Sequence, residues 1–146
     1  MERTGQLIPE SETFSGLMGV EFLPAPAGSA AARLKVERKL CQPMGFLSGG
    51  VSLALAETLA GYGSLGLCAS GEFPFGVQVS GNHLLPVPEG AWITARGTVL
   101  VRGRGLHVWN IEIFDEQGRL VSTSRVVNYI KRGGTHHGAE GMEANS

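Results

Sequence analysis

Residues 48–69 read SGGVSLALAETLAGYGSLGLCA, a segment that differs from the rest of the chain because it is apolar nearly all round. Leu, Ala and Gly dominate it, and Glu57 is its single charged side chain. About 20 residues of this composition predict one buried helix roughly 30 Å long, since an α-helix rises about 1.5 Å per residue. Such a helix needs other elements to cover it.

Covering elements are predicted on both sides of this helix in the sequence. In the second half of residues 30–37, apolar and polar side chains alternate as in a half-buried strand. Strands are also expected in four later segments, 75–85, 91–102, 106–115 and 119–131. A short helix is predicted over 6–17, followed by an extended segment over 18–23.

This order of elements predicts an α+β fold. An antiparallel meander would wrap the long central helix and cover it on all sides, which is the hot-dog architecture. We accordingly expect an N-terminal segment over 1–14, a hot-dog domain over 15–131, and a polar, Gly-rich and disordered tail over 132–146.

Composition narrows the classes of function. The chain has 146 residues, 42% of them hydrophobic, which suits one compact domain. A formal net charge of −1 gives no basic field, so nucleic acid is not expected as a partner. No run of about 18 apolar residues predicts a membrane span, and residues 1–9 do not resemble a secretory signal. We expect a cytoplasmic protein with Cys41 and Cys68 as free thiols.

Glu57 is the feature that calls for a function. It is the only charged residue between Lys39 and Glu72, and a carboxylate is costly to bury unless it is paired or used. A partly exposed position, or a bond to neighbouring backbone, would also account for it. The residues just before the helix favour a catalytic role, because they place an amide, Gln42, and two glycines, Gly49 and Gly50, at its start.

The start of a helix can stabilise negative charge. Its first N–H groups have no acceptor within the helix and lie at the positive end of the helix dipole, which suits a developing oxyanion. Gly49 and Glu57 are eight residues apart, or about 12 Å along the axis, so the two cannot touch one carbonyl carbon. If both act on one substrate, they must come from two subunits across a two-fold interface, and we expect an obligate dimer or a multiple of it.

Three segments resemble a known family: 42–59 (QPMGFLSGGVSLALAETL), 82–83 (NH) and 108–120 (VWNIEIFDEQGRL). They are similar to the PaaI-like hot-dog thioesterases, which include 1,4-dihydroxy-2-naphthoyl-CoA, 4-hydroxybenzoyl-CoA and enterobactin proofreading thioesterases. The resemblance covers roughly residues 15–131. Its most specific part is the spacing Q-P-x-G-x-L-x-G-G-x(6)-E.

The resemblance implies an acyl-CoA thioesterase that needs no metal or other cofactor, with CoA bound only as part of the substrate. Glu57 would attack the thioester or activate a water, while Gln42 and the Gly49 N–H polarise the carbonyl from the partner subunit. The family also implies a homotetramer built as a dimer of dimers. Two positions depart from the pattern: Ser48 stands where His is common, and Gly61 where Ser or Thr is frequent.

Further residues are candidates for substrate binding. His83 matches a histidine that relatives place near the acyl pocket. Gly50 is the second glycine of the matched spacing, and Thr58 follows Glu57. Arg102 and Arg104 flank a glycine at a strand turn and would meet the phosphates of CoA, or are ordinary solvated charges. Met44 and Phe46 line an acyl tunnel or fill a dimer core. His107 is expected in packing or at the surface, and the adjacent pair His136 and His137 is a weak metal signal.

The sequence supports hydrolysis of an aromatic or medium-sized acyl-CoA to the free acid and CoA. A hydratase or dehydratase on the same fold is disfavoured, because no histidine lies between Gly45 and Asn82. Two alternatives stay open. One is a catalytically weakened protein that binds acyl-CoA for regulation, to which the departure at Ser48 points, and the other is a thioesterase that acts on acyl-carrier protein.

Overall fold

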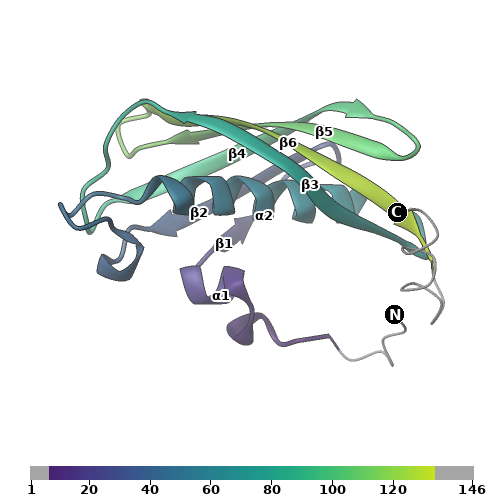
Figure 1. The fold of residues 1–146 in the computed structure, drawn as a ribbon, viewed down its shortest axis with the longest axis horizontal. Coiled ribbons are helices and arrows are strands. Elements are labelled where there is room, and N and C mark those ends of the chain that lie inside the picture. The colour runs from purple at the N-terminus through teal and green to yellow at the C-terminus, as the bar shows by residue number, and fades with distance from the viewer. Residues whose placement is uncertain (1–6, 134–146) are drawn as a thin grey trace.

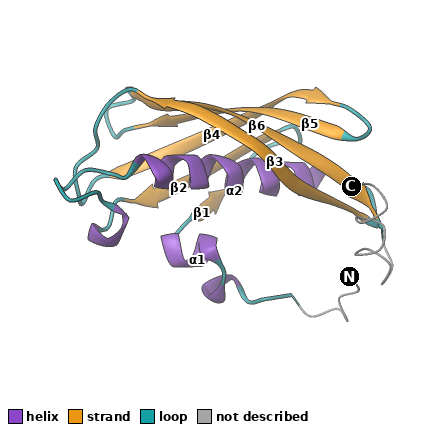
Figure 2. Ribbon diagram, in the orientation of Figure 1, coloured by secondary structure: helices purple, strands orange, loops and turns teal. Residues whose placement is uncertain are grey.

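The computed structural model describes residues 7–133, which form one long helix and a six-stranded antiparallel sheet (Figure 1). The strands make a curved layer along one side of the helix (Figure 2). The elements, in chain order, are α1 (Phe14–Met18), β1 (Glu21–Leu23), β2 (Ser29–Lys35), α2 (Gly49–Leu67), β3 (Glu72–His83), β4 (Trp92–Arg102), β5 (Leu106–Phe114) and β6 (Leu120–Arg132). The predicted tail lies almost entirely outside the described residues.

The strand order in the sheet is β1-β2-β4-β5-β6-β3. The prediction that the four strands after the helix form a simple meander is therefore wrong. Strands β4, β5 and β6 do form one, but β3 pairs with β6 and not with β4, its successor in the chain. The loop after β3 crosses to the other side of the meander, and β3 is left as an edge strand. Periodicity predicts strands, but it does not say which strands pair.

Helix α2 confirms the prediction made from residues 48–69, and it packs against the sheet through one face. Leu55, Ala56, Leu59 and Ala60 of that face are fully buried. The expectation that the sheet covers the helix on all sides is wrong for a single chain, because Tyr62 and Leu65 are about half exposed. A curved sheet contacts a helix along one side only, so the other apolar side needs a different partner.

The N-terminal segment also differs from the prediction. Instead of one helix over residues 6–17, a 3₁₀ turn spans Glu10–Glu12 and the short α1 follows. Thr13 separates the two because its backbone is extended, and its hydroxyl accepts a hydrogen bond from the Gly16 N–H at 3.2 Å as the cap of α1. The helix ends at Gly19, whose φ of 82° suits glycine.

Trp109 of β5 is fully buried against α2 and is the largest side chain of the core. A Cβ atom at Gly63 would lie 2.4 Å from the ring atom Cη2 of Trp109, and one at Gly97 would lie 2.8 Å from Ile111 Cδ1. Glycine at these positions allows the helix and the sheet to approach each other closely around the indole. No helix within residues 7–133 is long and apolar enough to cross a membrane.

Two glycines of α2 provide a matched test of this packing. We expect Gly63→Ala to lower the free energy of unfolding by about 1–3 kcal/mol, because the new methyl group overlaps the Trp109 ring. Gly66→Ala should instead leave stability unchanged or raise it by up to about 1 kcal/mol, since its Cβ meets no atom within 4 Å and alanine favours the helix. Urea unfolding measures both, and equal effects would contradict the packing argument.

Candidate active site

The start of α2 has backbone N–H groups without a side-chain cap. Ser48 is the N-cap residue, but its side chain makes no capping hydrogen bond. The N–H groups of Gly49 and Gly50 therefore lack both an acceptor within the helix and the usual side-chain cap. The backbone of Ser48 is held in place, because its N–H donates a hydrogen bond to the Leu40 carbonyl at 2.9 Å.

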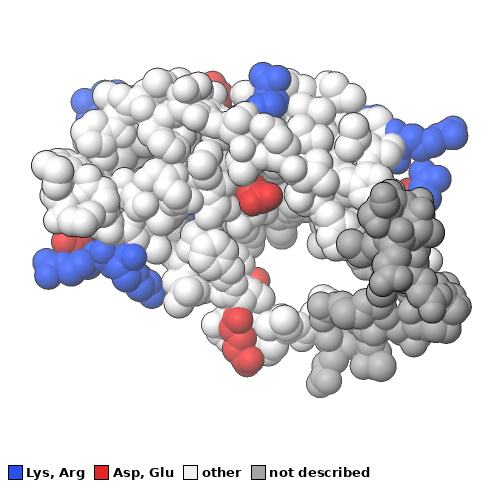
Figure 3. All heavy atoms as spheres, in the orientation of Figure 1, with Lys and Arg blue, Asp and Glu red and all other residues white. Residues whose placement is uncertain are grey.

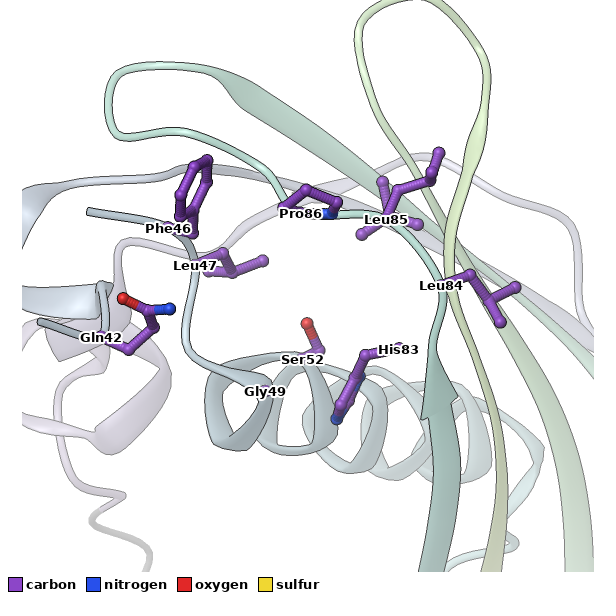
Figure 4. A pocket seen from close by; sticks show the side chains of 10 residues that line it. Gln42, Phe46, Leu47, Gly49, Ser52, His83, Leu84, Leu85 and Pro86 are labelled. Carbon is purple, nitrogen blue, oxygen red and sulfur yellow. The ribbon is translucent and has the colours of Figure 1, made fainter. Parts of the chain in front are cut away.

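A cavity of about 320 Å³ opens beside this helix start (Figure 4). Four of the residues singled out in the sequence meet there, namely Gln42, Phe46, Gly49 and His83. The cavity is also lined by Leu47, which belongs to the spacing matched in the sequence, and by Pro86. The sequence did not point to the other lining residues, Ser52, Leu84, Leu85 and Val121. Apolar walls around a few polar groups are typical of a binding site for a small molecule.

The amide of Gln42 is oriented by its own loop. Its Oε1 atom accepts a hydrogen bond from the Met44 N–H, which leaves the NH₂ group free to donate. In Figure 4 the nitrogen of this amide lies on the side of the cavity. Gln42 and the N–H of Gly49 can therefore both donate to an acceptor that enters the cavity.

His83 stands at the end of β3, where its ring rests on the first turn of α2. A Cβ atom at Gly49 would lie 2.7 Å from Cδ2 and 2.8 Å from Nε2 of this ring. Glycine is thus required at position 49 for the imidazole to reach the cavity. On its other side, Nδ1 of His83 lies 3.2 Å from the Oγ atom of Ser122 on β6.

Glu57 does not line this cavity. It is half-buried two turns further along α2, and its carboxylate lies against β3, where a Cβ atom at Gly76 would be 2.4 Å from Oε2. The pairing of β3 with β6 shifts between Gly76 and Gln78, so an irregularity of the edge strand accompanies this contact. Within one chain, the structure therefore separates Glu57 from the residues that would polarise a substrate.

The other candidate residues are distributed around α2. Ser48 and Gly50 line a second cavity of about 350 Å³, together with Phe14, Leu17, Met18, Lys39, Leu40 and Val51. Met44 is 80% exposed, so it does not belong to the core of a single chain. Thr58 and Gly61 are half-buried, and a Cβ atom at Gly61 would meet no atom within 4 Å.

Arg102 and Arg104 lie at the opposite end of α2 from the cavity. The guanidinium of Arg102 donates a hydrogen bond to the Leu67 carbonyl at 3.1 Å, at the end of the helix. Its positive charge there interacts favourably with the negative end of the helix dipole. Arg104 is exposed. In the view of Figure 3, most of the Lys and Arg side chains lie toward the two ends of the molecule, while acidic side chains also appear near the middle of this face.

A buried polar cluster under α2 was not found from the sequence. The hydroxyl of Ser64 is 2.8 Å from Nδ1 of His107 and receives hydrogen bonds from Trp109 Nε1 at 2.8 Å and Asn128 Nδ2 at 3.0 Å. Because Trp109 and Asn128 use both lone pairs of this oxygen, its proton is directed to His107. The three partners, His107 and Trp109 on β5 and Asn128 on β6, alternate like ordinary strand residues, so nothing in the pattern marks them as partners of Ser64.

The environment of His107 disfavours its charged form. Burial lowers the pKa of His107 below its ordinary value of 6.5, and the nearby Arg102 lowers it further, against an opposing effect of Glu72. The pKa of Glu72 is itself held below 4.5, first by the Ala69 N–H and also by Arg132. Among residues 7–133 there is no group of three or more His, Cys, Asp or Glu side chains that would hold a metal ion.

One long helix against a curved antiparallel sheet is the hot-dog fold, and solved structures of hot-dog thioesterases match it closely. A thioesterase from Haemophilus influenzae superposes with a TM-score of 0.82 at 33% identity, over 87% of this chain and 88% of that one. The PaaI protein of Escherichia coli, 23% identical with a TM-score of 0.75, shares the fold.

The sequence comparisons agree with the fold. The model of the thioesterase superfamily matches residues 44–122, and the chain belongs to this family. A 1,4-dihydroxy-2-naphthoyl-CoA hydrolase of Listeria monocytogenes is 35% identical over 79% of this chain and 93% of its own length. A proofreading thioesterase of Cronobacter turicensis is 35% identical over 75% of this chain and 79% of its own length. The protein is a thioester hydrolase, as the resemblance implied.

The buried histidine makes a prediction for acid stability. Because the pKa of His107 is lower in the folded than in the unfolded chain, the unfolded chain binds more protons below pH 6.5, and folding stability falls as the pH drops. We expect the free energy of unfolding to fall between pH 7.5 and 5.5, by at most about 1.4 kcal/mol per pH unit from this group. The pKa of Glu72 lies below this window.

The comparison variant is His107→Gln, which retains an acceptor for the Ser64 hydroxyl but does not titrate. Its unfolding free energy should change less over the same pH interval than that of the wild type. Urea unfolding at each pH measures the difference, and identical slopes for the two proteins would show that His107 does not carry the effect.

Proposed function

We propose that this protein hydrolyses an acyl-CoA thioester to the free acid and CoA in the cytoplasm. In this proposal Glu57 is the nucleophile or the general base, and the donors around the start of α2 polarise the carbonyl. The observation that carries the proposal is the cavity that gathers Gln42, Gly49 and His83 at an open helix N-terminus.

The chemistry follows from these groups. Donors fixed in advance of the reaction stabilise the negative charge that develops on the thioester oxygen. The Gln42 amide and the Gly49 N–H are such donors, because the loop and the helix hold them in place. The carboxylate of Glu57 then attacks the carbonyl carbon, or removes a proton from the water that attacks it. Since a thiolate is a good leaving group, we expect no metal or other cofactor.

A second copy of the chain would complete the site. Glu57 lies about 12 Å along the helix from Gly49 and outside the cavity of its own chain. The side of α2 that the sheet does not cover is apolar, and the edge strand β3 beside Glu57 exposes Phe73, Phe75 and Val77. These features support a dimer with two shared active sites, and two such dimers would form the tetramer that the resemblance implies.

The acyl group is proposed to be aromatic or of medium size. The cavity of one chain holds about 320 Å³, and its apolar walls come from Phe46, Leu84, Leu85 and Pro86. A site of this size suits a ring or a short chain better than a long fatty acyl group. The relatives named for hydrolysis of an aromatic CoA ester support the same choice.

Removal of the carboxylate tests the assignment of Glu57. We expect Glu57→Ala and Glu57→Gln to lower kcat by about 10²–10⁴-fold, because each variant lacks the carboxylate that acts as base or nucleophile in this proposal. Thiol release from a panel of aromatic, short and long acyl-CoAs, and from an acyl-carrier-protein thioester, measures the loss.

Glu37→Gln is the matched control, since Glu37 is an exposed carboxylate outside both cavities. Full turnover by Glu57→Ala would disprove the role of Glu57. Tight CoA binding with no turnover of any thioester would instead identify a binding or regulatory protein. Ser48, which stands where histidine is common in the family, is the observation that favours this alternative.

The shared site predicts complementation between two inactive variants. Homodimers of Glu57→Ala and of Gln42→Ala should each lack an intact site, whereas a mixed dimer has one intact site of two. Random mixing by co-refolding makes half of the dimers mixed, so we expect about one quarter of the wild-type activity. No recovery in a mixture shown by differential tags to contain mixed dimers would place the whole site within one chain.

A further inference from the structure

We propose that Ser122 is a positioning residue that holds His83 with its Nε2–H group as a hydrogen-bond donor toward the substrate cavity. This inference rests on the proposed function for its role in turnover. The underlying claim concerns the tautomer of one histidine, and it can be tested without any substrate.

The geometry begins with the pairing of two strands. His83 is the last residue of β3 and lies directly opposite Ser122 in the register of β3 with β6. Ser122 is fully buried, and its hydroxyl is 3.2 Å from Nδ1 of His83. The imidazole is held between this hydroxyl and the first turn of α2, where Gly49 leaves room for it.

The hydroxyl of Ser122 decides which ring nitrogen carries the proton. Within the described part of the chain, Nδ1 of His83 is its hydrogen-bonding partner. If Nδ1–H donated to the oxygen, the buried hydroxyl proton would be left without an acceptor, which is costly. If the hydroxyl donates to Nδ1, both groups are satisfied, and the proton of neutral His83 resides on Nε2.

The second ring nitrogen of His83, Nε2, lies beside the start of the helix. Nε2 lies at the start of α2, 2.8 Å from the point that a Cβ atom of Gly49 would occupy, and the ring lines the cavity. In Figure 4 the ring of His83 lies beside the first turn of α2, across the cavity from Gln42. The Nε2–H group thus joins the Gln42 amide and the Gly49 N–H as a third donor. It keeps its proton and donates only a hydrogen bond.

With this assignment His83 supplies an imidazole to the site, although Ser48 stands where the family commonly has histidine. Ser48 lines the second cavity and is absent from the lining of the one that holds Gln42 and Gly49. A histidine donor is nevertheless present in the first cavity, because it comes from the end of β3. Ser122 supplies the hydrogen bond that gives this donor its direction.

The same strand offers a matched control. Ser124 is the next residue of β6 on the inner face, 4% exposed, and its Oγ has no hydrogen-bonding partner among the described residues. Ser124→Ala removes a buried hydroxyl of the same kind without removing a bond to a histidine. It also lies outside the lining of both cavities.

The first measurement is the ¹⁵N spectrum of histidine-labelled protein at pH 8.5, where free histidine is neutral. His83→Gln assigns the resonances. We expect His83 to be the Nε2–H tautomer in the wild type and in Ser124→Ala, and a mixture of tautomers in Ser122→Ala. Ser122→Thr, which restores a hydroxyl, should return the spectrum toward that of the wild type. A wild-type ring protonated at Nδ1 would overturn the proposal.

The second measurement is steady-state turnover of the best acyl-CoA substrate. Loss of one neutral hydrogen bond predicts a decrease in kcat of about three- to tenfold for Ser122→Ala, with KM changed less than about twofold. Ser124→Ala should stay within about twofold of the wild type. Equal kcat values for the two alanine variants would overturn the role in turnover. If no thioester is hydrolysed, the proposed function fails, while the ¹⁵N spectrum still decides the tautomer.

Discussion

The contact between one face of α2 and the sheet is the interaction on which the rest of the structure depends. Leu55 and Leu59 bury their side chains in it, and Trp109 fills the space that Gly63 leaves open. Each fully buried side chain of this size contributes about 1.5–3 kcal/mol by its removal from water. The same contact fixes where the helix begins and ends relative to the strands, and therefore which side chains can meet at its start.

Two consequences of that placement define the site. The helix start is brought beside the end of β3, so that Gly49 and His83 share a cavity with Gln42. The carboxylate of Glu57 is directed toward Gly76 on the edge strand, away from that cavity. In the function proposed above, these are two halves of one active site, and the uncovered apolar side of α2 is where a second copy of the chain would bring them together.

Much of the fold could be predicted because its signals are local. The apolar segment 48–69 and the alternating segments after it correspond to α2 and to β3–β6 within a few residues. The errors came from contacts between distant segments. Strand β3 pairs with β6, a long-range contact that no local pattern predicts. Thr13 divides the predicted N-terminal helix, because its cap outweighs a weak helical pattern. Of the candidate site, the sequence pointed to Gln42, Gly49 and His83. It did not point to Ser52 of α2 or Ser122 of β6, because nothing in the local pattern distinguishes them from other helix and strand residues.

The sequence by itself determined the central helix, the period of the strands and the isolation of Glu57 among apolar residues, because each depends on neighbours within a few positions. It also determined that Gly49 and Glu57 are too far apart to act on one carbonyl within a single helix. Only the tertiary structure decided that His83 rests on Gly49, that Ser122 bonds to its ring, and that Ser64, His107 and Asn128 form one buried cluster. These contacts join residues 34 to 64 positions apart. The packing of α2 on the sheet and the pairing of β3 with β6 bring them together, and no local pattern encodes either.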